Sequence, residues 1–220
     1  MKPGDKIEIF TDPMKGEHSE GKAELVKLLN SYPDAEYWIV RFPDGWTGPR
    51  LIKKDMKVFT HSELVEIGYK WCINKCAFAF KELVTLNGTG EIPDIIGFKD
   101  DGTFLLEAKT SYSDFLSDKK KWFRKRPEYG MGDWRFYICP VGMIKINELF
   151  PGWGLIEVNE KGKARTIYNP FGKGNVYSRW RKQTKNYTAE QAMMFSALRR
   201  LHIRNRIDEI YETVPRLIKK

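Results

Sequence analysis

The chain has 220 residues, of which 41% are hydrophobic, enough to fill the core of one domain or of one domain with a small extra module. Its formal net charge of +9 is typical of proteins with a polyanionic partner, although ribosomal and anion-binding proteins share this balance. The N-terminus lacks the apolar segment of a secretion signal, and no stretch is long and apolar enough to span a bilayer. We therefore expect a cytoplasmic protein that does not act at a membrane.

The three cysteines, Cys72, Cys76 and Cys139, do not form the pattern of a disulfide framework. Cys72 and Cys76 are one helical turn apart in an apolar segment, and no further ligands follow at the spacing of a zinc site. We expect buried thiols in a reducing compartment.

Residues 1–59 are predicted to form a small β module with strands at 4–10, 23–29, 36–42 and 50–52. Gly and Pro punctuate the joins, and the pattern resembles an SH3-like β-barrel of the KOW or Tudor sort. Four aromatic residues lie in or beside the third strand: Tyr37, Trp38, Phe42 and Trp46. We expect three of them in the barrel core and Trp46, in a turn, partly exposed.

Residues 60–220 are predicted to form a second domain that begins with a helix over 61–83. Ser62 is the expected N-cap, and Glu63 and Glu66 fall in the first turn, where acidic side chains favour the helix dipole.

A β-hairpin is predicted next, with strands over 94–99 and 103–110 joined by the turn Asp100-Asp101-Gly102. Alternation along the second strand places Glu107 and Lys109 on the same face as Leu105. Asp94 opens the neighbouring strand and is expected near Glu107. Two carboxylates held together repel each other, and a divalent cation relieves that repulsion. The hairpin therefore predicts a metal site with a lysine beside it.

The elements after the hairpin alternate between helices and strands. We expect a helix over 112–126, a central strand over 134–140, a short helix over 143–150 and strands over 154–159 and 164–168, giving a mixed sheet flanked by helices. A basic tail follows, with a helix capped by Thr188 whose apolar stripe (Met194, Ala197, Leu198, Leu201, Ile207 and Ile210) packs on the sheet.

Basic side chains gather in two places: at the end of the 112–126 helix and in the tail. A solvated basic face explains most such runs, but proximity to Glu107 and Lys109 favours phosphate contact. The residues predicted to bind nucleic acid are Lys119, Lys120, Lys121, Arg124, Lys125, Arg126, Arg179, Arg181, Lys182, Lys185, Arg199 and Arg200.

The pair Pro93-Asp94 followed by Glu107-Ala108-Lys109 resembles the motif of the PD-(D/E)xK nucleases. The downstream pattern, Asp114-Phe115 to Lys121-Trp122, Arg135-Phe-Tyr and Gly154-Leu-Ile, resembles the MmcB-like DNA-repair branch of that superfamily. The resemblance covers roughly residues 61 to 160. It implies an α/β (α+β) restriction-endonuclease-like core.

The resemblance also implies a catalytic site. Mg²⁺, for which Mn²⁺ can substitute, would be held by Asp94, Glu107 and the carbonyl of Ala108, and Lys109 would position or activate the attacking water. A helix glutamate completes the site in many members. Glu66 is the preferred candidate here, with Glu63 as the alternative and Glu82 a less favoured third.

We therefore expect a metal-dependent endonuclease that acts on DNA, in repair, restriction or phage DNA metabolism. The alternatives are a catalytically silent DNA-binding protein of the same fold, an RNA-processing nuclease, and an adaptor whose barrel binds a protein. Two-fold assembly suits cleavage of both strands of a duplex, so a homodimer is also considered.

Overall fold

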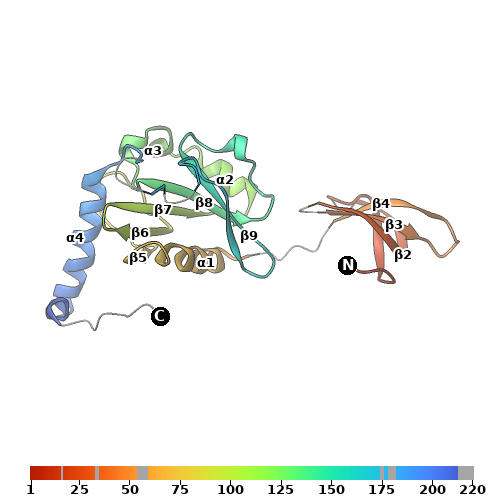
Figure 1. The fold of residues 1–220 in the computed structure, drawn as a ribbon, viewed down its shortest axis with the longest axis horizontal. Helices are drawn as coiled ribbons and strands as arrows, with labels where there is room; N and C mark the ends of the chain where they lie inside the picture. The colour runs from red at the N-terminus through yellow and green to blue at the C-terminus, as the bar shows by residue number, and fades with distance from the viewer. Residues whose placement is uncertain (16, 33–34, 54–58, 174–175, 178–181, 213–220) are drawn as a thin grey trace.

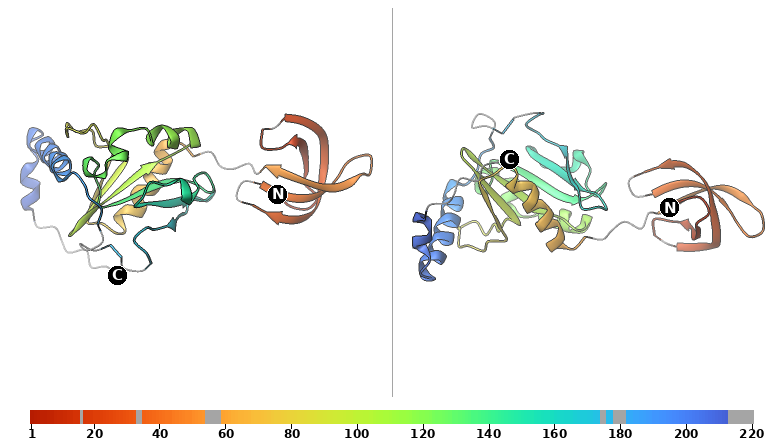
Figure 2. Two further views of the ribbon diagram at one scale, coloured as in Figure 1. Left: turned by 90° about the horizontal axis from the view of Figure 1, so that it is seen from above. Right: turned by 60° about the horizontal axis from the view of Figure 1, so that its bottom comes forward.

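The computed structural model describes residues 1–15, 17–32, 35–53, 59–173, 176–177 and 182–212. The first four strands are β1 (Lys6–Asp12), β2 (Glu17–Ser31), β3 (Ala35–Arg41) and β4 (Thr47–Lys53). They form an antiparallel sheet in the order β1-β2-β3-β4, which curls into a half-barrel (Figures 1 and 2). Alternate residues of these strands face inward and build its core, including Ile9, Leu25 and Val40. The four predicted strands are confirmed.

The aromatic residues of the half-barrel divide differently from the prediction. Trp38 is buried and Trp46 is 46% exposed, as expected, but Tyr37 is exposed as well. Tyr37 alternates with Trp38 along β3, so the two rings lie on opposite faces of the sheet. The guanidinium of Arg50 lies 4.6 Å from the ring centroid of Trp46, and the Trp46 ring also contacts Phe42.

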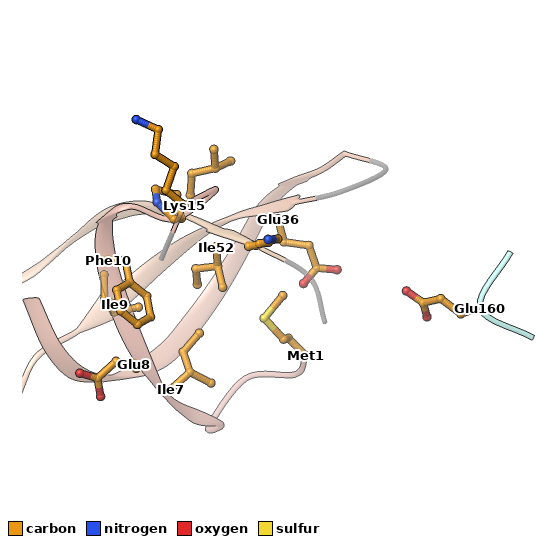
Figure 3. A pocket seen from close by; sticks show the side chains of 12 residues that line it. Met1, Ile7, Glu8, Ile9, Phe10, Lys15, Glu36, Ile52 and Glu160 are labelled. Atoms are coloured by element: carbon orange, nitrogen blue, oxygen red, sulfur yellow. The ribbon is translucent and has the colours of Figure 1, made fainter. Parts of the chain in front are cut away.

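The half-barrel also contains a cavity of about 630 Å³ (Figure 3). Ile7, Ile9 and Ile52 give it an apolar wall, and Glu160 is the one lining residue that comes from residues 60–220. None of the lining residues is among those predicted to bind metal or nucleic acid.

The second sheet has six strands: β5 (Phe78–Lys81), β6 (Ile95–Lys99), β7 (Gly102–Ala108), β8 (Trp134–Pro140), β9 (Trp153–Val158) and β10 (Ala164–Tyr168). Their order is β10-β9-β8-β7-β6-β5. The pairs β7–β8 and β8–β9 are parallel, and the outer pairs are antiparallel. The predicted mixed sheet and the α+β fold class are confirmed.

Helices cover both faces of this sheet. On one face α1 (His61–Ile73) packs through Leu64, Val65 and Cys72 (Figures 1 and 2). On the other lie α2 (Tyr112–Asp118), α3 (Trp122–Lys125) and the start of α4 (Tyr187–Ile203). The described residues of this second unit also include three 3₁₀ turns, η1 (Pro127–Tyr129), η2 (Ile146–Glu148) and η3 (Ile207–Tyr211). No helix in the described part of the chain is long and apolar enough to cross a membrane.

Several predicted helix boundaries are wrong. The first helix is capped by Thr60 rather than Ser62 and ends at Ile73, because the aromatic run Phe78–Lys81 pairs with β6 as an edge strand. The predicted 112–126 helix is broken between α2 and α3. The predicted 143–150 helix is only the 3₁₀ turn η2.

The C-terminal helix also differs from its prediction. α4 is capped by Asn186, whose side chain accepts a hydrogen bond from the N–H of Ala189. Ala189 and Met193 are its buried apolar residues, whereas Leu198 of the predicted stripe is exposed. Only the first turns of α4 pack on the sheet, so most of the predicted stripe has no core to enter.

Candidate functional site

The β6–β7 hairpin brings Asp94 and Glu107 together, as their spacing predicts. The register that pairs Ile95 with Leu106 continues to Asp94 opposite Glu107. The N–H of Ala108 donates a 2.7 Å hydrogen bond to Asp94 Oδ2, which fixes the Asp94 carboxylate against β7. Burial, and after it the charge of Glu107, raises the pKa of Asp94 to about 7. The two carboxylates therefore repel each other in this structure.

An outer group of ligand atoms forms around Asp94. One ligand atom from each of His61, Glu82 and Asp94 lies within 4.8 Å of the others. His61 Nε2 is 3.2 Å from Glu82 Oε1 and 3.5 Å from Asp94 Oδ1. Imidazole nitrogen and carboxylate oxygen are ordinary ligands of divalent metals. We call His61, Glu82 and Asp94 the outer triad.

Local structure explains why these residues meet. Thr60 and Glu63 form a reciprocal capping box that starts α1 at His61. Glu82 follows β5 with a positive φ of 47°, uncommon for a residue other than glycine. Its N–H donates a 3.0 Å hydrogen bond to the carbonyl of Asp94, which holds Glu82 against the strand that Asp94 opens.

An inner group of charges lies behind Asp94 and is almost fully buried. Arg124 places its guanidinium among three carboxylates: it pairs with Glu91, its Nη2 is 2.7 Å from Glu107 Oε1, and its Nε donates a 2.9 Å hydrogen bond to Asp118 Oδ2. Lys109 Nζ lies 3.3 Å from Glu107 Oε2 and 3.4 Å from Asp118 Oδ1. We call these five residues the inner network. Two cations thus face three buried carboxylates.

The pKa values of the inner network follow from this balance. Burial acts to lower the pKa of Lys109, but the charges of Glu107 and Asp118 raise it above its ordinary value. Burial opposes ionisation of Asp118, yet Arg124 brings its pKa well below the usual range. Burial raises the pKa of Glu91 in spite of Arg124. Lys109 is therefore a cation at neutral pH.

Two further contacts complete the inner network. The hydroxyl of Tyr137 donates a 2.9 Å hydrogen bond to Asp118 Oδ2, and the N–H of Met131 donates one of 2.6 Å to Glu91. Glu107 Oε1 lies close to the guanidinium of Arg124, but the geometry of this contact is not that of a hydrogen bond. This buried oxygen therefore accepts no hydrogen bond. Such an oxygen retains the capacity to accept a further ligand.

The candidates for the third carboxylate occupy different places. Glu66 is exposed and pairs with Lys81, while the Glu63 side chain accepts a hydrogen bond from the N–H of Thr60. Glu82, the least favoured of the three, is the one that stands beside Asp94. Ala108 contributes its N–H to the Asp94 carboxylate.

The basic residues predicted to bind nucleic acid also separate into groups. Arg124 and Lys185 are buried, and Lys185 pairs with Asp133 and Glu190. Arg179 and Arg181 lie outside the described residues. Two others are half-buried, Lys119 and Lys182. The exposed members are Lys120, Lys121, Lys125, Arg126, Arg199 and Arg200.

Sequence reasoning missed His61 and Asp118. His61 directly precedes the predicted N-cap Ser62, and because Thr60 caps the helix instead, His61 is the first residue of α1. Asp118 lies within the acidic pattern that follows the Glu-x-Lys strand, so its spacing was visible but its burial beside Lys109 was not.

Comparison of the chain with protein-family models, with curated proteins and with solved structures finds no match.

Proposed function

We propose that this protein is a metal-dependent endonuclease that hydrolyses phosphodiester bonds in DNA, with a core of the PD-(D/E)xK type and an SH3-like N-terminal module. The observation that carries the proposal is the meeting of Asp94, Glu107 and Lys109 at the end of one β-hairpin, beside His61 and Glu82. The positive net charge of the chain supports a nucleic acid as the substrate.

The donor set fits a divalent cation such as Mg²⁺ or Mn²⁺. The outer triad supplies one nitrogen and two carboxylates, and Glu107 Oε1 is a buried oxygen without a hydrogen bond. A cation bound by the outer triad beside Glu107 would polarise the scissile phosphate and lower the pKa of a water ligand. His61, Glu82, Asp94 and Glu107 are the residues proposed to hold it.

Lys109 has a separate role in this proposal. Because Glu107 and Asp118 raise its pKa, it stays protonated and cannot serve as a general base at neutral pH. It instead holds a fixed positive charge beside the position of the phosphate, where negative charge develops during hydrolysis. Arg124 and Asp118 fix Glu107 and Lys109 from behind.

The test is a cleavage assay with supercoiled, linear duplex, single-stranded and branched DNA and matched RNA, each with Mg²⁺, Mn²⁺ or EDTA. Asp94→Asn, Glu107→Gln and Lys109→Met are each expected to lower the cleavage rate by about 100-fold or more. Glu66→Gln is the matched control, because Glu66 is an exposed carboxylate outside the outer triad, and it is expected to cut normally. Cleavage by Asp94→Asn at the wild-type rate would refute the proposal, and preference for RNA would change its substrate.

A catalytically silent DNA-binding protein is the second candidate. It is favoured by the burial of Glu107, whose two oxygens each face a cation of the inner network. In that case Mn²⁺ neither supports cleavage nor raises the melting temperature. A rise of the melting temperature with Mn²⁺ that is lost in His61→Ala favours the enzyme. A metal ion raises the melting temperature only if it binds the folded chain in preference to the unfolded chain.

A further inference from the structure

Two aromatic side chains stand in solvent on the segment that follows α2. Trp122 is 47% exposed and Tyr129 is 38% exposed, and their ring centroids are 5.0 Å apart. Phe123, the neighbour of Trp122, is buried, so α3 directs the ring of Phe123 into the core and the ring of Trp122 outward. Burial of Phe123 anchors α3 to the core. Core packing therefore does not account for the exposed rings of Trp122 and Tyr129.

Exposed cations flank this aromatic pair along the chain. Lys120, Lys121, Lys125 and Arg126 are all exposed, and the Arg126 guanidinium lies 6.0 Å from the ring centroid of Tyr129. Glu128 is the one acidic residue between positions 119 and 129. Aromatic faces among cations are the combination that binds single-stranded nucleic acid, because the rings stack on bases while the cations contact phosphates. A protein partner would need a strongly acidic surface to match this charge.

A chain of contacts ties the exposed pair to the candidate site. Lys121, the residue before Trp122, places its Nζ 2.8 Å from Asp118 Oδ1. The same Asp118 oxygen is 3.4 Å from Lys109 Nζ. A DNA strand bound on α3 would therefore lie next to the candidate site, because Lys121 and Asp118 connect the start of α3 to Lys109.

We propose that Trp122 and Tyr129 form a stacking platform for unpaired bases of single-stranded DNA, next to the candidate site. The proposal rests on the proposed function in taking DNA as the polymer. Bases within a duplex already stack on their neighbours and offer no free face to a protein ring, so the platform selects DNA with unpaired nucleotides. Lys120, Lys121, Lys125 and Arg126 bind phosphates of either form and contribute affinity without this selection.

The test measures binding, in EDTA, of a labelled oligonucleotide of about 12 nucleotides, single-stranded or as a duplex. Trp122→Ala and Tyr129→Ala are expected to weaken single-strand binding by about 5- to 150-fold and duplex binding by less than about threefold. Trp122→Phe keeps a stacking ring and should retain most of the single-strand affinity. Lys125→Ala should weaken both forms alike. Tyr168→Ala, an exposed tyrosine on the edge strand β10, is the matched control and should change neither.

A second measurement does not depend on folding of the variants. The wild-type chain is expected to bind a strand of abasic residues at least about fivefold more weakly than a normal strand of equal length, because only the phosphate contacts remain. Equal binding of the two strands, or equal losses for single strand and duplex in Trp122→Ala, would overturn the platform. Absence of cleavage together with base-dependent binding would instead refute the proposed enzyme and leave the platform standing.

Discussion

Removing the buried guanidinium of Arg124 is expected to destabilise the second unit strongly. Arg124 contacts the carboxylates of Glu91, Glu107 and Asp118, and all four side chains are at most 2% exposed. Arg124→Met keeps an apolar stem of similar length but leaves three buried carboxylates with Lys109 as their remaining cation in the inner network. Breaking a buried pair by removing one partner typically costs about 3–5 kcal/mol, because the charge left behind is uncompensated. We expect a loss of that size in the free energy of unfolding.

Urea denaturation followed by near-UV circular dichroism measures this loss, provided that the slope with denaturant is unchanged. Arg126→Met is the matched control: Arg126 is exposed, so a change within about 0.5 kcal/mol is expected. Adding Glu91→Gln to Arg124→Met should recover part of the loss. The deficit should also shrink as pH falls through about 4, where the carboxylates become protonated. A loss in Arg124→Met no larger than in Arg126→Met would refute the inner network.

Two further substitutions test the environment of β6. The folded-state pKa of Asp94, about 7, is above its ordinary 3.8, so the folded chain binds more protons between these values and Asp94 lowers stability as pH rises through them. In EDTA, Asp94→Asn should therefore raise the melting temperature at pH 8 and leave it unchanged at pH 4; equal shifts at both would contradict this environment. In Gly97→Ala the new Cβ would lie 2.3 Å from Cys72 Sγ and 2.7 Å from Cys76 Sγ, so a loss of about 1–3 kcal/mol is expected in urea denaturation. Cys76→Ala in the same chain should recover part of it, and no recovery would show that the Cys76 thiol is not an obstacle.

The parts of the fold that the sequence predicts well are those set by local patterns. The 94–110 hairpin is marked by its Asp-Asp-Gly turn and by alternation, and the structure forms it nearly as expected. The segment Phe78–Lys81 fits a helix as well as a strand, and pairing with β6 decides it. The break between α2 and α3 likewise depends on distant partners, because Asp118 turns inward to meet Arg124 and Tyr137.

The candidate site shows the same limit at the level of side chains. Asp94, Glu107 and Lys109 are close in sequence along one hairpin, so their meeting follows from strand register alone. The outer triad also needs the first residue of α1 and the residue after β5, which come together only when β5 joins the sheet. Charge runs predict surface cations in general, but the sequence does not distinguish the buried Arg124 from the exposed Lys125 beside it.

The inner network and the outer triad differ in how far their charges are compensated by neighbouring side chains. Arg124 and Lys109 compensate most of the charge of Glu91, Glu107 and Asp118, so the inner network can remain buried without a metal. Glu82 is exposed, His61 and Asp94 beside it are half-buried, and Asp94 is further opposed by Glu107. A divalent cation is therefore expected to stabilise the outer triad more than the inner network. On this basis metal binding should depend chiefly on His61, Glu82 and Asp94, whereas the position of Lys109 should depend on Asp118.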